Sequence, residues 1–119
     1  MSSDLINSNI RSILVFSDDT GFPQLLKSLP VELVCGLVGA EIRPAQHPHL
    51  QRFAQIHGFP LLIQPRISTP TYSAFVGQLR KLRPDLILVS SYSMMLRPDV
   101  LAISRFGGVN IHGALLPQY

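Results

Sequence analysis

Short apolar runs alternate along this chain with segments whose apolar residues recur at helical spacing, and this alternation constrains the fold most. The runs predict five strands, over residues 13–16, 33–38, 61–63, 86–89 and 109–112. The segments between them predict helices over residues 22–29, 49–57, 72–83 and 97–103. Strands that are apolar on both faces are typical of a parallel sheet covered by helices. Right-handed crossovers then give a doubly wound, Rossmann-like α/β domain.

The composition supports a soluble cytoplasmic protein. The chain has 119 residues, 46% of them hydrophobic and 14% charged, which argues against disorder. Its net charge of +3 comes without a cluster of Lys and Arg, so nothing indicates a nucleic-acid interface. The single cysteine, Cys35, predicts a reducing compartment. We expect no signal peptide, because no basic segment followed by an apolar stretch opens the chain, and no membrane span, because the apolar runs are too short.

Several familiar site motifs are missing from the sequence. The first strand is followed by Ser-Asp-Asp-Thr-Gly rather than by a glycine-rich dinucleotide turn, and neither a phosphate loop nor a serine-hydrolase elbow is present. His47, His49 and His57 lack the spacing of a metal site, so we interpret them as surface residues around a helix. We therefore predict no metal.

Two further polar features are interpreted structurally. Cys35 lies within a predicted strand, where a thiol behaves as a small apolar side chain. Asp18 and Asp19 follow the first strand and could bind a ligand there. We favour a role at a turn and helix start, since carboxylates stabilise the amino end of a helix.

The residues best suited to chemistry are Asn110 and His112. Side chains alternate along a strand, so these two should project to one side and Val109 and Ile111 to the other. They would lie at the carboxyl edge of the sheet, where ligands bind in open α/β folds. An amide and an imidazole together can stabilise the charge that develops when a nucleophile attacks a carbonyl-like carbon. A hydrogen-bonded strand end without catalytic function is the alternative.

Residues 110–119, with the sequence NIHGALLPQY, resemble the signature N-[LIV]-H-x-S-L-L-P-x-[YFW] of the folate-dependent formyltransferases. This family includes methionyl-tRNA formyltransferase, glycinamide ribonucleotide formyltransferase and sugar N-formyltransferases. The match departs at Ala114, where the family usually has Ser. Residues 85–96 also resemble the family's fourth strand and folate loop, and the resemblance extends over about residues 11–119.

The resemblance implies a mechanism and a donor. An amine would attack the formyl carbon of 10-formyltetrahydrofolate, while Asn110 and His112 stabilise the tetrahedral intermediate and handle protons. The pterin pocket would be formed by Ser91, Tyr92, Met94, Met95, Leu96, Leu115, Leu116 and Pro117. For Met94, Met95 and Leu96, ordinary core packing is an equally good interpretation. The family's catalytic Asp would lie beyond Tyr119, so we expect residues 1–119 alone to show negligible transfer.

The resemblance also implies the organisation of the chain. Residues 1–10 would be a flexible amino terminus, and residues 11–119 part of a formyltransferase amino-terminal catalytic domain, with strand order 3-2-1-4-5 and the sheet truncated after the fifth strand. The acceptor, methionyl-tRNA or an amino sugar, is open, and direct binding of nucleic acid by this part is not expected. Two alternatives are a formyltetrahydrofolate hydrolase and a non-catalytic binding or interaction module.

Overall fold

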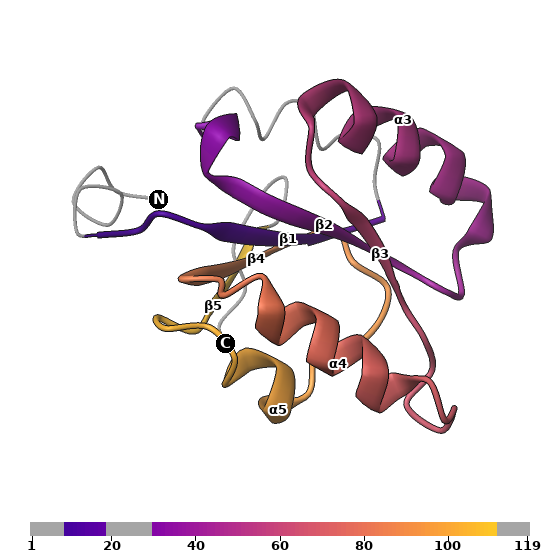
Figure 1. Cartoon of the computed structure of the whole chain (residues 1–119). Coiled ribbons are helices and arrows are strands. Elements are labelled where there is room, and N and C mark those ends of the chain that lie inside the picture. Colours follow the sequence, from indigo (N-terminus) through magenta and orange to yellow (C-terminus); the bar gives the residue numbers. More distant parts are fainter. Residues whose placement is uncertain (1–8, 19–29, 112–119) are drawn as a thin grey trace.

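A computed structural model describes residues 9–18 and 30–111 of the chain. Five strands form one parallel sheet in the order β3-β2-β1-β4-β5 (Figure 1). The strands are β1 (Ile13–Ser17), β2 (Val34–Ala40), β3 (Leu61–Gln64), β4 (Leu86–Ser90) and β5 (Gly108–Ile111). The predicted fold class and strand order are therefore confirmed.

Helices cover both faces of the sheet (Figure 1). Helix α3 (His47–His57) lies on one face, and α4 (Tyr72–Lys81) and α5 (Pro98–Leu101) lie on the other. Two single 3₁₀ turns, η1 (Val31–Leu33) and η2 (Pro44–Gln46), precede β2 and α3. The helix predicted over residues 22–29 lies outside the described residues.

The helix ends follow from local backbone chemistry. Helix α3 ends at Gly58, whose φ of 82° is left-handed and whose N–H bonds to the Ala54 carbonyl. Helix α5 is shorter than the predicted 97–103. It begins at Pro98, whose ring fixes a helical φ, and it ends at Leu101. Beyond this end, the Ser104 hydroxyl lies 3.0 Å from the Leu101 carbonyl oxygen and 2.8 Å from the Gly107 carbonyl oxygen.

Alternate residues of β1 supply two separate cores. Ile13 and Val15 pack with Leu50 and Ala54 of α3, whereas Leu14 and Phe16 face the helices on the opposite side. The second cluster includes the α4 and α5 residues Tyr72, Phe75, Val76, Leu79 and Val100. Because both faces are apolar and covered, only the ends of the strands are available for a polar site.

Two glycines allow helices to approach the sheet closely. A Cβ at Gly39 in β2 would lie 2.7 Å from Leu50 Cδ1, and one at Gly108 in β5 would lie 2.8 Å from Leu101 Cδ2. Both distances are shorter than real carbon contacts. Helix α3 can therefore pack against β2, and α5 against β5, only because these strand positions have no side chain.

Candidate functional site

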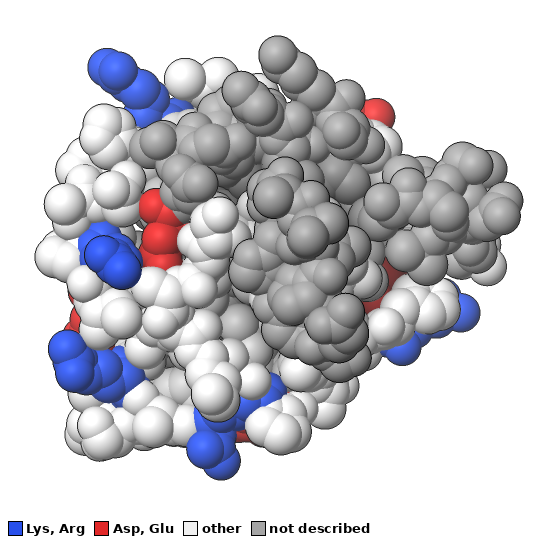
Figure 2. All heavy atoms as spheres, turned by 180° about the vertical axis from the view of Figure 1, so that it is seen from behind, with Lys and Arg blue, Asp and Glu red and all other residues white. Residues whose placement is uncertain are grey.

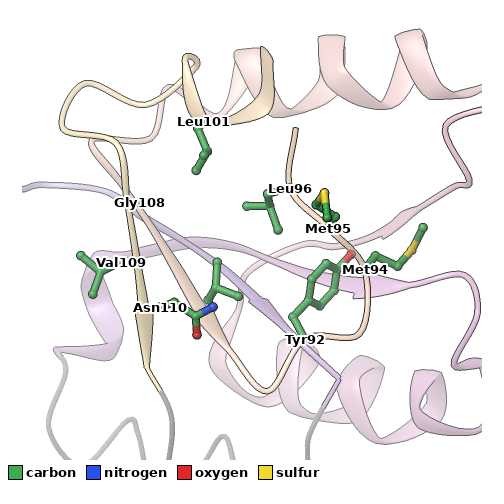
Figure 3. A pocket seen from close by; sticks show the side chains of 9 residues that line it. Tyr92, Met94, Met95, Leu96, Leu101, Gly108, Val109 and Asn110 are labelled. Carbon is green, nitrogen blue, oxygen red and sulfur yellow. The ribbon is translucent and has the colours of Figure 1, made fainter. Parts of the chain in front are cut away.

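A cavity of about 410 Å³ lies at the carboxyl edge of the sheet, between the loop after β4, α5 and β5 (Figure 3). Its walls are mainly apolar, with the amide of Asn110 and the phenol of Tyr92 as polar groups. The lining residues are Val89, Tyr92, Met94, Met95, Leu96, Leu101, Gly108, Val109 and Asn110. Its volume is within the range of small-molecule sites, and it lies at the edge where ligands bind in open α/β sheets.

Asn110 is presented to this cavity by the alternation of β5. Val109 and Ile111 pack against the core on the α3 face, whereas Gly108 faces Leu101 of α5. Figure 3 shows the Asn110 side chain on the opposite side of the strand from Val109. The predicted orientation of Asn110 relative to these neighbours is confirmed. His112 lies outside the described residues, so its orientation toward the same side stays a prediction.

The loop after β4 begins with a turn that most side chains avoid. Ser91 has a left-handed φ of 50°, and its carbonyl accepts a 3.2 Å hydrogen bond from the Asp18 N–H. Ser91 is exposed and does not line the cavity. Its role in folate binding stays a prediction, and in the structure Ser91 is the residue at which the loop turns.

The Asp18 carboxylate fixes this loop from the end of β1. Asp18 is 6% exposed. One oxygen accepts the Ala40 N–H at 2.9 Å, and the other accepts the Ser93 N–H at 2.8 Å and the Ser93 hydroxyl. The carboxylate thus joins the ends of β1 and β2 to the cavity loop. This bridging role was not predicted, and the helix that Asp18 was expected to precede lies outside the described residues.

Tyr92 is held in the cavity wall through its ring and its hydroxyl. The ring meets Phe16 edge to face, with centroids 5.3 Å apart and planes at 80°. The hydroxyl donates a 2.6 Å hydrogen bond to Oε1 of Gln64, which is 4% exposed at the end of β3. Burial, and next the charge of Asp18, raise the pKa of Tyr92 above its ordinary value. The phenol therefore keeps its proton and serves as a hydrogen-bond donor.

The apolar residues of the loop differ in burial. Leu96 packs against the core cluster that includes α4 and also lines the cavity. Core packing is thus confirmed for Leu96, and its contact with a pterin stays a prediction. Met95 is 84% exposed, and core packing is the wrong interpretation for this residue. Met94 is partly buried and lines the cavity as well. Exposed, adaptable methionines beside a cavity are typical of binding surfaces. Leu115, Leu116 and Pro117 lie outside the described residues.

The other polar residues singled out from the sequence are three histidines and Cys35. His49 and His57 are exposed, and Nε2 of His47 lies 2.7 Å from the Ala40 carbonyl oxygen. Within residues 9–18 and 30–111, no group of three His, Cys, Asp or Glu side chains could hold a metal ion. Burial raises the pKa of Cys35 to about 11, so the thiol stays protonated.

None of the described residues that line the cavity is charged. On the face shown in Figure 2, Lys and Arg side chains are spaced around the rim rather than gathered in one patch. In the part of the chain that is described, no helix combines the length and the apolar character needed to cross a bilayer.

The fold is that of a Rossmann-like domain, with a cavity at the carboxyl edge of its sheet. Residues 30–119 match the family described as formyl transferase. The chain therefore belongs to the formyl transferase family.

Curated relatives are methionyl-tRNA formyltransferases. The protein from Ruminiclostridium cellulolyticum is 39% identical over 72 residues, which are 60% of this chain and 22% of that protein. The protein from Mycolicibacterium gilvum is 37% identical over 81 residues, which are 68% of this chain and 25% of that protein. This chain thus spans about a quarter or less of the length of these relatives.

Two solved structures share the fold. Glycinamide ribonucleotide transformylase 1 from Geobacillus kaustophilus superposes with a TM-score of 0.66 at 22% identity, over 92% of this chain and 61% of that one. Phosphoribosylglycinamide formyltransferase from Streptococcus pneumoniae gives a TM-score of 0.64 at 22% identity, over 91% of this chain and 59% of that one.

Sequence reasoning missed two residues that shape the site, Gln64 and Leu101, and it did not predict the bridging role of Asp18. Gln64 and Asp18 hold the loop, and Leu101 of α5 forms a wall of the cavity. A signal was present for Gln64, because it is a polar residue at the end of an apolar strand and its side chain reaches the sheet edge where ligands bind. Leu101 gave no such signal, since an apolar residue on a short helix usually belongs to the core.

Proposed function

We propose that this protein transfers the formyl group of 10-formyltetrahydrofolate to an amine. The observation that carries the proposal is the position of Asn110. In a chain of the formyl transferase family, its amide faces the same cavity that is walled by Tyr92, Met94, Met95 and Leu96. A hydrogen-bond donor and an apolar slot are thereby combined at one edge of the sheet.

The cavity suits the pterin end of the donor. A pterin is a flat heteroaromatic ring, and Leu96, Leu101 and the ring of Tyr92 offer apolar surface to such a group. The polar edge of a pterin needs hydrogen bonds, which main-chain groups of residues 92–96 can supply. The cavity volume of about 410 Å³ is within the range of small-molecule sites.

Asn110 would act on the charge that develops during transfer. The amine nitrogen attacks the formyl carbon, and the carbonyl electrons move to its oxygen. The Asn110 amide donates a hydrogen bond to that oxygen. When the carbonyl re-forms, the bond from carbon to N10 of the folate breaks, N10 takes a proton, and the amine loses one. His112 is proposed for this proton transfer, because it follows Asn110 at the spacing of two residues.

The aspartates in the described part of the chain make contacts away from Asn110, so we assign no step of the formyl transfer to them. The Asp18 carboxylate is taken up by Ala40 and Ser93. Asp85, before β4, accepts the Arg11 N–H at 2.7 Å, and Asp99 lies 3.8 Å from Arg97 on the surface.

Methionyl-tRNA is our first candidate acceptor, because the curated relatives are methionyl-tRNA formyltransferases. An amino sugar is the second. We place the reaction in the cytoplasm, since the free, half-buried thiol of Cys35 suits a reducing compartment.

The test uses the protein encoded by the complete reading frame, with 10-formyltetrahydrofolate and either acceptor. Asn110→Ala should lower kcat about a hundredfold or more, as loss of an oxyanion donor does, with little change in folate affinity. Ile111→Ala, which removes a side chain packed against the core from the next position and does not line the cavity, is the matched control and should change stability more than kcat. Release of formate without any formylated amine would instead indicate a hydrolase. Folate binding without turnover would indicate a binding module.

A further inference from the structure

Gln64 is a buried polar side chain that makes two contacts with the cavity loop. It is the last residue of β3 and is 4% exposed. Its Oε1 accepts the Tyr92 hydroxyl at 2.6 Å, and its Nε2 donates to the Met95 carbonyl at 3.4 Å. The Gln64 amide thus contacts the loop at two points, at Tyr92 before Met94 and at Met95 after it.

The chemistry of the partners fixes the orientation of this amide. The Met95 carbonyl can only accept a hydrogen bond, so the amide nitrogen of Gln64 must face it. Oε1 is then left for the Tyr92 hydroxyl, which can donate. No other arrangement satisfies both contacts, so Gln64 defines the distance between Tyr92 and Met95.

Gln64 lies behind the cavity wall rather than in it. Tyr92 and Met95 both line the donor cavity, whereas Gln64 lines a neighbouring hollow on the far side of Met94 and Met95. An effect of Gln64 on a ligand must therefore pass through the loop. Asp18 holds the same loop at Ser93 independently of Gln64.

We propose that Gln64 is a positioning residue for the formyl donor, which holds Tyr92 and Met95 in the arrangement that the pterin ring requires. This inference rests on the function proposed above. Without the Gln64 contacts, the loop would have to become ordered when the donor binds, and that ordering lowers affinity. The rate of the chemical step should not change, because Asn110 is carried by β5 and not by the loop.

The experiment compares Gln64→Met with Gln55→Met in the full chain. Methionine keeps the length of the side chain and removes both contacts, and Gln55 is an exposed glutamine of α3. Gln64→Met should bind 10-formyltetrahydrofolate about tenfold more weakly by calorimetry, the factor set by loss of one typical buried hydrogen bond. Its kcat should be unchanged, and the amides of Met95 and Leu96 should exchange with solvent faster than in the wild type. Gln55→Met should match the wild type in all three measurements.

If Gln64→Met does not fold, Gln64→Asn gives the same test, since it keeps a polar amide at this buried position but is one methylene too short to reach both Tyr92 and Met95. The inference is overturned if affinity and loop exchange are both unchanged, or if kcat falls while affinity is preserved. A wild-type chain that fails to bind the donor while Gln64→Met still speeds loop exchange would refute the proposed function. That result would leave the loop contact intact but remove its role in donor binding.

Discussion

The Asp18 carboxylate should be one of the main determinants of stability at the site. In Asp18→Ala, the Ala40 N–H loses its acceptor in a fully buried position, and an unsatisfied buried donor costs about 1–3 kcal/mol. The Ser93 N–H and hydroxyl also lose their acceptor, but Ser93 is exposed and water can replace it, so about 1 kcal/mol is expected there. We predict that the free energy of unfolding falls by about 2–4 kcal/mol.

The assay is urea or thermal unfolding followed by circular dichroism. For a domain of this size, the loss corresponds to a decrease in Tm of about 8–20 °C. Asp18→Asn keeps one acceptor oxygen and should lose about half as much. The control is Asp99→Asn, an exposed residue whose change should stay within about 0.5 kcal/mol.

Two results would refute this reasoning in different ways. Asp18→Ala with the Tm of the wild type would mean that the carboxylate contributes nothing to the fold, despite its contacts with β2 and the loop. A variant with unchanged stability that no longer binds folate would make Asp18 a ligand-binding residue, which is the interpretation we did not favour from the sequence.

Further predictions concern packing, ionisation and an unpaired hydroxyl. Gly108→Ala should destabilise the fold by about 1–3 kcal/mol in urea unfolding, because the new methyl group would push Leu101 toward the cavity. The pKa of Cys35 is raised from 9.0 to about 11, so its contribution to stability is fully present below about pH 9 and is lost as the pH rises toward 11. Cys35→Ala should flatten that decline, and rapid alkylation of native Cys35 at neutral pH would contradict the pKa. Tyr72→Phe should leave the Tm unchanged or raise it, since the buried Tyr72 hydroxyl has no partner among the described residues, and a clear loss of stability would show an overlooked bond.

The sequence was sufficient for the fold because the relevant signals are local or periodic. Apolar runs such as residues 86–89 need both faces covered, and that requirement leads to a parallel sheet. The strand order came from family resemblance, since β2 and β4 are equally apolar and nothing in either specifies its neighbour. The length of α5 was overestimated, because the Ser104 contacts that follow it are not visible in a periodic pattern.

The site was only partly predictable. Asn110 and the loop of residues 92–96 belong to segments that resemble family motifs, and in the structure they line one cavity. The roles of Asp18 and Gln64 depend on contacts between residues 75 and 28 positions apart in sequence. No local pattern encodes such contacts, and a buried carboxylate that binds backbone N–H groups looks in sequence like any turn residue.

The central claim is that 10-formyltetrahydrofolate binds at the carboxyl edge of β4 and β5. The most direct measurement is a titration of the ¹⁵N-labelled full chain with 10-formyltetrahydrofolate, followed residue by residue through the amide resonances. The account predicts that the amides of Tyr92, Met94, Met95, Leu96 and Asn110 shift together and saturate with a single Kd. Shifts confined to the opposite edge of the sheet, around Arg83 and Arg105, or no shifts at saturating ligand, would contradict it.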